Sequence, residues 1–387
     1  MSKLPDEITE EILVRPPASS LLRFNLVCRH WQSLISNPSF VTKHLNHVLL
    51  LDLDDHQSNS NHLKFIVKSA ATSDLHSVDC ESLYSTKLDF PLQSPPHRLL
   101  ILGSCNGLLC IMLLDGVNSF GNILLWNPLL RDYNKLPEST SSIQEDSSIS
   151  GGYSCMLGFG YDSSIDDYKV VRVITNPRSD IHKVDIYTRN TNSWKRIQDF
   201  IPYGMVDPPF SIEGTLVNGS LYWAYVDFDY GNYYEEVGDS IIIGFDLIEE
   251  KFRSVEFPRD DMKSMSGVIL VEVRGCLGFC KVQHHIRDID VWILKEDDNK
   301  NGFWSKLMKI QYEFGMLGKP VCFLKNDEVL LSISELGGNG DANLVVYNPA
   351  NMTFRNLPAC GASTLSQEII YVETLVSPHG GGWRLKR

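Results

Sequence analysis

Residues 124–137 read LLWNPLLRDYNKLP, a short apolar strand, a polar turn and a second strand that carries an aromatic residue. Four later stretches repeat this unit, with starting points 48 to 60 residues apart: VDIYTRNTNSWKRI (184–197), IIGFDLIEEKFRSVEFP (242–258), DVWILKEDDNKNGFWSKLMKI (290–310) and LVVYNPANMTFRNLP (344–358). The repetition predicts at least five copies of one β-rich supersecondary unit.

A second hairpin is expected ahead of each unit. Asn106-Gly107 and Asn218-Gly219 separate apolar runs in GSCNGLLC (103–110) and GTLVNGSLYW (214–223). Asn-Gly is a strong signal for a tight hairpin, because both residues tolerate positive φ. Each repeat therefore has about four strands, the size of a β-propeller blade, and such blades must stack around an axis to bury both faces.

Both ends of the β-rich region are expected to share one blade. Strands are predicted at residues 48–53, 63–69 and 75–80, and a further one at residues 369–376. Combining them would complete a sixth blade and pair its edge strands. Six blades are favoured, and seven are the alternative.

The N-terminal stretch, LPDEITEEILVRPPASSLLRFNLVCRHWQSLISNPSFVTKHL (4–45), has a different period. Its apolar residues recur at helical spacing, which predicts two or three short helices; they include Ile8, Ile12, Leu13, Phe24, Val27, Cys28, Trp31, Leu34 and Ile35. About 40 residues without a metal site or paired cysteines usually cannot fold alone. The missing core must come from another protein or from the rest of the chain.

This stretch resembles the plant F-box pattern without a gap, through Leu4-Pro5, Glu11 to Leu13, Ser20 to Phe24, Val27-Cys28, Trp31 and Leu34 to Phe40. The resemblance implies binding to a Skp-type adaptor, which links an F-box protein to a cullin and a RING subunit in a ubiquitin ligase. It further implies which residues face the adaptor or the small helical core: Leu4, Pro5, Ile8, Ile12, Leu21, Leu22, Val27 and Trp31.

Two positions depart from the F-box pattern: Pro16 stands where a leucine is common, and Ser19 where a lysine is common. The alternative interpretation of residues 4–45 is an ordinary helical cap packed on the remaining domain.

The rest of the chain resembles the F-box-associated, or F-box/kelch, region of the same family. The matching residues are 103–110, 125–128, Gly158 to Asp162, Asp167 to Val171, 216–223 and Tyr371 to Val376. In that family these residues build a scaffold. The expected fold class is α+β, with a helical F-box at residues 1–45 and an all-β, propeller-like domain at residues 46–387.

Composition narrows the classes of partner. Residues 1–45 hold five Lys/Arg and four Asp/Glu, so the remaining 30 Lys/Arg and 44 Asp/Glu give the β-rich remainder a net charge of −14, against −13 for the whole chain. An acidic body without a basic stripe argues against nucleic acid. Acidic residues interrupt the N-terminus where a signal peptide needs an apolar run, and no stretch is long enough to span a membrane. Nine scattered cysteines suit the reducing cytosol or nucleus.

Motifs that suggest catalysis are weak. Gly103 to Gly107 matches G-x-C-x-G, the pattern of a nucleophile elbow with Cys105 as the nucleophile. An elbow needs a strand, a tight turn and then a helix, whereas Leu108 to Leu114 reads as a strand. A propeller hydrolase using Cys105 stays an alternative function, and no catalytic residue is predicted.

Metal and cofactor motifs are also unsupported. Cys276 and Cys280 precede His284 and His285, but on a strand the two sulfurs would lie on the order of 13 Å apart, too far for one zinc. The acids of GYDSSIDDYK (160–169) lack the glycine and the distal glutamate of a calcium loop. Gly158 and Gly160 lack the third glycine of a dinucleotide loop. No metal or cofactor is expected.

Two insertions are candidate binding surfaces instead. Residues 138–152 are serine-rich, and residues 227–239 place Phe228, Tyr230, Tyr233 and Tyr234 among acids. Aromatic residues on loops often dominate binding energy, although these could equally fold back on their own blade.

The function that these observations favour is a non-enzymatic substrate receptor. The F-box would recruit the adaptor and cullin, and the β domain would hold a client protein near the ubiquitin-charged enzyme. The alternatives are the Cys105 hydrolase and a non-degradative scaffold whose F-box is weakened at Pro16.

Overall fold

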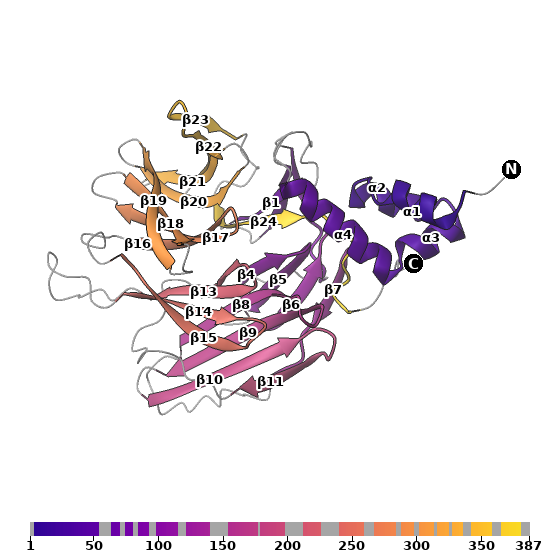
Figure 1. Cartoon of the computed structure of the whole chain (residues 1–387), viewed down its shortest axis with the longest axis horizontal. Helices are drawn as coiled ribbons and strands as arrows, with labels where there is room; N and C mark the ends of the chain where they lie inside the picture. The colour runs from indigo at the N-terminus through magenta and orange to yellow at the C-terminus, as the bar shows by residue number, and fades with distance from the viewer. Residues whose placement is uncertain are drawn as a thin grey trace. The chain divides into compact units, whose positions relative to one another are not determined.

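A computed structural model describes residues 4–53, 63–69, 74–79, 84–92, 98–114, 121–139, 154–176, 179–197, 212–225, 240–258, 267–283, 288–297, 302–312, 316–324, 327–335, 342–357 and 365–380. Within these ranges four helices precede twenty-four strands (Figure 1). The chain forms two compact units, one of residues 1–136 with 366–387 and one of residues 137–365.

The first unit begins with the helices α1 (Asp6–Leu13), α2 (Ala18–Phe24), α3 (Arg29–Ile35) and α4 (Pro38–Leu53). Pro5 and Pro17 are the N-cap residues of α1 and α2, and Pro38 opens α4, where a missing N–H costs nothing. Cys28 caps α3, because its sulfur accepts the N–H of Trp31 at 3.5 Å. The apolar faces of these helices meet in one small core around Leu13, Leu21 and Ile35.

The strand predicted at residues 48–53 is wrong, because these residues form the last turns of α4. The apolar run has no alternation that would distinguish a strand from a buried helix. Val48 lies one turn beyond His44 and Leu45, and all three side chains are buried. The run therefore continues the helical face that starts before it, and an established helix propagates cheaply.

The first sheet combines both ends of the β region, as predicted. Its strand order is β24-β1-β2-β3, from β24 (Leu365–Val372), β1 (Leu63–Ser69), β2 (Leu75–Asp79) and β3 (Ser85–Lys87). In Figure 1 the yellow β24 runs beside the indigo β1. Two details differ from the prediction: β24 ends four residues before Val376, and the fourth strand is β3.

The second sheet of this unit contains β4 (Arg98–Cys105), β5 (Leu108–Leu114), β6 (Ile123–Asn127) and β7 (Asp132–Lys135) in sequential order. Asn106 and Gly107 form the predicted tight turn, with φ of 51° and 82°. A Cβ at Gly107 would clash with Thr374. Both the positive φ and the lack of space therefore require glycine at this position. The two sheets of the unit pack through one core that includes Ile66, Ile111 and Tyr371.

The second unit contains four more four-stranded antiparallel sheets within the described ranges. Their strands are β8 (Ser154–Asp162), β9 (Asp167–Asn176), β10 (Ser179–Thr188), β11 (Ser193–Ile197); β12 (Thr215–Val217), β13 (Ser220–Tyr225), β14 (Ile241–Asp246), β15 (Lys251–Glu256); β16 (Gly267–Val273), β17 (Cys276–Gln283), β18 (Asp288–Glu296), β19 (Gly302–Gln311); β20 (Met316–Phe323), β21 (Val329–Glu335), β22 (Ala342–Asn348) and β23 (Thr353–Asn356).

The five repeated units of the sequence are confirmed as hairpins of the third and fourth strands of their sheets. In the copy at 184–197, for example, Val184 pairs with Ile197 and Tyr187 with Trp194. Asn218-Gly219 forms the first hairpin of its sheet, with φ of 45° and 73°.

Consecutive sheets of the second unit pack face to face through apolar cores. Trp223 and Phe245 pack against residues of the β8–β11 sheet, Phe279 packs against the β12–β15 sheet, and Val291 packs against the β20–β23 sheet. Neighbouring turns also interact: the Asn218 amide donates to the carbonyl of Gly275, and Arg274 pairs with Asp327. Each sheet is therefore stabilised mainly by its neighbours, as expected of stacked blades.

The division between residues 45 and 46 stays a prediction, and α4 runs through it from Pro38 to Leu53.

Candidate functional site

Helix α1 presents an exposed apolar stripe. Leu4, Ile8 and Ile12 follow one another at four-residue spacing and are 59%, 47% and 50% exposed. Ile8 and Ile12 share one face of α1, because residues four apart lie on the same face of a helix, and Leu4 directly precedes the Pro5 N-cap of α1. The opposite face of α1 carries Leu13, which is buried in the helical core. The helix thus buries Thr9 and Leu13 and leaves Ile8 and Ile12 open to a partner.

Two further apolar residues lie in the turn after α2. Leu26 and Val27 are 76% and 63% exposed. His30 at the start of α3 lies 3.2 Å from the carboxylate of Asp6 at the start of α1, which brings this turn toward the stripe. Leu4, Ile8, Ile12, Leu26 and Val27 are together called the apolar patch below.

The eight residues expected to face the adaptor or the helical core fall into two groups, one exposed at the surface and one packed in the core. Leu4, Pro5, Ile8, Ile12 and Val27 are exposed. Leu21 is fully buried, and Leu22 and Trp31 are half-buried against the core. Leu21 therefore takes the core role, because it reaches no surface that a partner could contact. Sequence analysis missed Leu26, although an apolar residue directly before Val27 was a usable signal.

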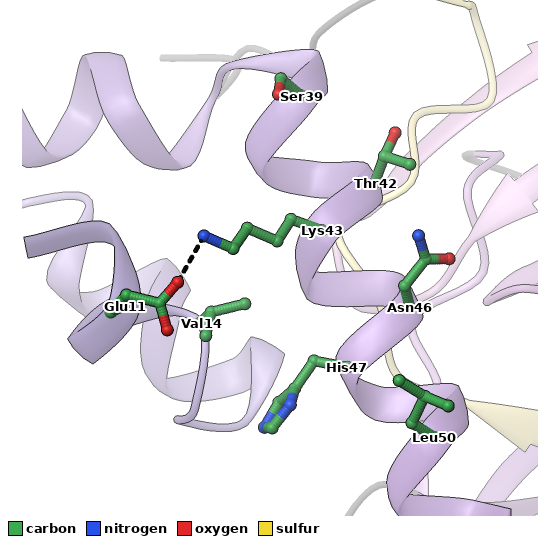
Figure 2. A pocket seen from close by; sticks show the side chains of 8 residues that line it. All are labelled: Glu11, Val14, Ser39, Thr42, Lys43, Asn46, His47 and Leu50. Carbon is green, nitrogen blue, oxygen red and sulfur yellow. Dashed lines mark hydrogen bonds and ion pairs between the residues drawn. The ribbon is translucent and has the colours of Figure 1, made fainter. Parts of the chain in front are cut away.

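An ion-pair network joins α1 to α4. Lys43 of α4 lies 2.7 Å from Glu11 and 3.1 Å from Glu10, and Figure 2 shows its side chain reaching across a shallow pocket toward Glu11. Its hydrogen bond to Glu11 raises the pKa of Lys43 and lowers that of Glu11. Val14, His47 and Leu50 also line this pocket. These ion pairs connect α1 to α4 at the surface of the protein.

Pro16 does not interrupt a helix. It lies in the turn between α1 and α2, and its carbonyl oxygen is 2.9 Å from Nε2 of the buried His44. The ring N–H of His44 thus satisfies a carbonyl that a proline turn would otherwise leave unpaired. The departure from the F-box pattern at this position is accommodated within the helical fold.

Cys105 is not placed as a nucleophile. It ends β4, and the turn after it leads into strand β5 rather than into a helix. Desolvation raises the pKa of its thiol to about 12. A thiol in that state is almost entirely protonated at neutral pH, which removes the reactive thiolate.

The acids of residues 160–169 form a hairpin turn and a buried ion-pair network. Asp162 accepts hydrogen bonds from the N–H and hydroxyl of Ser164, and Lys169 lies 2.6 Å from its other oxygen. Lys169 also contacts Glu250 at 2.8 Å and the carbonyl of Leu247 at 2.6 Å. Lys195 pairs with the second oxygen of Glu250. The network links the β8–β11 and β12–β15 sheets.

The pKa values of this network follow from its geometry. Burial is the largest single influence and opposes the charged forms, but several favourable interactions together outweigh it and lower the pKa of Asp162 and of Glu250. They come from Lys169 at both acids, from Ser164 at Asp162 and from Lys195 at Glu250. Burial likewise opposes the charge of Lys169, but its hydrogen bonds and charge interactions with both acids together raise its pKa. All three groups are therefore charged at neutral pH, which suits a structural role.

Gly158 and Gly160 have a packing role in β8. A Cβ at Gly158 would lie 2.6 Å from Leu221, and one at Gly160 would lie 2.6 Å from Leu247. Both glycines allow the next sheet to approach closely.

Cys276 and Cys280 lie on β17, and burial raises the pKa of the Cys280 thiol. Within the described ranges, no group of three or more His, Cys, Asp or Glu side chains could hold a metal ion. His284 and His285 lie outside those ranges, as do Phe228, Tyr230, Tyr233 and Tyr234 and most of the serine-rich insertion.

Over the part of the chain that the structure describes, no helix has both the length and the apolar character needed to cross a membrane.

Comparison with known proteins matches each of the two parts of the chain to a family model. A family model described as "F-box associated beta propeller domain" matches residues 55–377, and one described as "F-box-like" matches residues 1–47. The resemblance seen in the sequence is confirmed, and so is the fold class, with six blades among the described strands.

The similar proteins come from Arabidopsis thaliana. The F-box/kelch-repeat protein At3g23880 is 28% identical over 97% of this chain and 96% of its own length. The F-box protein CPR1 is 28% identical over 80% of this chain and 74% of its own length. The putative F-box protein At3g16210 is 30% identical over 67% of this chain and 62% of its own length.

Among solved structures, a protein of unknown function from Bacteroides caccae aligns over 80% of this chain and 99% of its own, with 10% identity and a TM-score of 0.41.

Proposed function

Because this chain belongs to the F-box associated beta propeller family, we propose that it is the substrate-recognition subunit of a Skp-cullin-F-box ubiquitin ligase. Its helices bind a Skp-type adaptor, which connects it to a cullin, and its β domain binds a client protein. The chain carries out no catalysis itself. It raises the local concentration of client lysines beside the ubiquitin-charged enzyme.

The observation that carries this proposal is the apolar patch. The helices already bury a core of Leu13, Leu21, Ile35 and Phe40, so the exposed residues of the patch are not needed for their own packing. Leu4, Ile8 and Ile12 nevertheless remain large, apolar and close to half exposed or more. Contiguous apolar surface on a folded protein marks an interaction site.

Client binding is assigned to the insertion at residues 227–239. Residues 226–239 are the second connection of their sheet, from β13 to β14.

The composition of this insertion supports client binding through Phe228, Tyr230, Tyr233 and Tyr234. These aromatic residues stand among acids in an insertion between two strands. Aromatic residues on loops often dominate the binding energy of an interface.

The proposed assembly belongs in the cytosol or the nucleus. Among the described residues Cys105, Cys110 and Cys155 form no disulfide, which fits either compartment.

The test uses two variants of the full chain, expressed in plant cells with the proteasome blocked. A double variant Ile8→Gln and Ile12→Gln should lose the adaptor but keep its clients, and ubiquitination of those clients should stop. A triple alanine variant of Tyr230, Tyr233 and Tyr234 should keep the adaptor and bind clients at least about tenfold more weakly, because buried aromatic anchors carry much of the binding energy.

Ubiquitination that continues unchanged in the double variant would contradict the receptor role. Turnover of a substrate by the purified chain, abolished by Cys105→Ser, would favour the hydrolase. A chain that captures clients without ever binding the adaptor would be a scaffold.

A further inference from the structure

The segment after β24 is buried although it belongs to no strand. Residues 374–378 have buried side chains, and Thr374 and Leu375 are almost completely inaccessible. Residues 373–379 are called the C-terminal strap below. A polar and irregular segment is rarely buried unless its backbone groups find partners.

The strap is held by the β4–β7 sheet. Asn127, at the end of β6, is fully buried, and its amide donates to the carbonyls of Thr374 at 3.0 Å and Val376 at 2.8 Å. The Thr374 hydroxyl donates to the carbonyl of Asn106 at 2.7 Å, in the β4–β5 turn. His379 lies 3.3 Å from the carboxylate of Asp132. The strap thus has a fixed path across this sheet.

Leu375 extends from the strap into the helical core. It is 1% exposed and shares that core with Leu13, Leu21, Ile35 and Phe40. Leu129 and Leu130, in the turn directly after Asn127, pack against the same core. The helices therefore bury part of their apolar surface against residues that the sheet and the strap hold in place.

We propose that the C-terminal strap completes the F-box core through Leu375, so that adaptor binding near the N-terminus depends on residues more than 320 positions away. The part of this inference that concerns adaptor binding rests on the function proposed above. The chain itself supplies the core that residues 4–45 lack. The same contact fastens the helices to the β4–β7 sheet, so the adaptor is held in a fixed orientation relative to that blade.

Two measurements on the full chain test this inference. The first is amide hydrogen exchange of the wild type and of Leu375→Ala. The variant should exchange at least about tenfold faster in α2, α3 and α4, because removing a buried leucine from a small core destabilises it locally. Exchange in the β8–β11 sheet should not change. The second is the affinity for a purified Skp-type adaptor, which should fall by about tenfold or more.

A matched control is Ile66→Ala, which removes a fully buried aliphatic residue from the core between the two sheets of the same unit. It should accelerate exchange in β1 and β5 while α2 and α3 keep their wild-type rates. If Leu375→Ala prevents folding, Leu375→Val provides a milder loss at the same site, with the same direction expected.

Unchanged exchange in the helices of both Leu375 variants would overturn the inference. Faster exchange with unchanged adaptor affinity would overturn its functional half. If wild-type chain does not bind the adaptor, the proposed function fails, and the exchange measurement alone then decides whether the strap completes the helical core.

Discussion

Trp31 is a half-buried residue whose ring meets the ring of Phe24 edge-on, with centroids 5.7 Å apart. Its backbone N–H also donates to the sulfur of Cys28, the N-cap of α3. Trp31→Ala should lower the stability of the helices by about 2 kcal/mol, less than the roughly 3–5 kcal/mol of a fully buried tryptophan. Hydrogen exchange in α2 and α3 would measure it.

Cys28→Ala is the control for this change, because it removes the cap and leaves the ring. A Trp31→Ala variant with wild-type exchange in both helices would mean that the ring does not contribute to the core.

Helical spacing predicts which residues share a face but not which face meets the core. Leu21 and Ile12 have the same apolar character, yet Leu21 is buried and Ile12 is half exposed. Leu21 belongs to the core that Leu375, Leu129 and Leu130 also contact, whereas Ile12 does not. These contacts join residues far apart in the chain, and nothing in residues 4–45 encodes them.

Lys169 of β9 connects two sheets through buried charges, and its removal should be costly. Lys169→Met would leave Asp162 and Glu250 without their shared cation, which should cost about 3–5 kcal/mol at pH 7. The matched control is Lys195→Met. Lys195 pairs with the same glutamate but is more than half exposed, so it should cost less than about 1 kcal/mol. Urea denaturation of each variant would show the difference.

The pH dependence of this network follows from its pKa shifts. Asp162 and Glu250 have lowered pKa values, so their stabilisation is complete above about pH 4 and is lost as the pH falls through the lowered values. Lys169 has a raised pKa, so its contribution persists to about pH 10 and is lost only above it.

The deficit of Lys169→Met relative to wild type should therefore be largest near pH 7 and shrink toward pH 3, measured by thermal denaturation across that range. A deficit that grows on acidification would show that the carboxylates do not depend on Lys169.

The spacing of apolar residues and the Asn-Gly turns predicted most strands but not every strand boundary. The Asn-Gly turns and the aromatic hairpins carry local signals, and the structure places both as expected. The short β3 was missed because Ser85, Thr86 and Lys87 show no apolar alternation. The end of β24 was predicted too late, because Thr374 and Val376 are residue types common in strands. In the structure their carbonyl groups instead accept hydrogen bonds from the Asn127 side-chain amide.

The pairing of β24 with β1 joins the two ends of the β region in one sheet. Deletion of residues 366–387 would remove most of β24, the buried Tyr371 and the strap. We expect the melting temperature to fall by at least about 10 °C, because several buried side chains are lost at once. Differential scanning calorimetry provides the measurement.

Deletion of residues 381–387 is the control, because it leaves β24 and the strap intact. A chain without residues 366–387 that melts in one sharp transition at the wild-type temperature would contradict a closed first blade.

The sequence was sufficient to predict a helical segment followed by stacked four-stranded blades, because repeats and turns are local patterns. The dependence of the helices on the strap could not be predicted, because it arises from the path of residues 373–379 after β24. The client-binding loops at Phe228 and the nearby tyrosines stay a prediction, since they lie outside the described residues.

The most direct measurement of the receptor role is a calorimetric titration of a purified Skp-type adaptor into the full chain. Ile12→Gln, in the apolar patch, is compared with Ile165→Gln, which changes an equally exposed isoleucine in the β8–β9 turn. We expect saturable binding to wild type and to Ile165→Gln, and binding at least about tenfold weaker for Ile12→Gln, because a buried isoleucine contributes one to two kcal/mol or more. Absence of binding by wild type, or equal affinity of the two variants, would contradict the account.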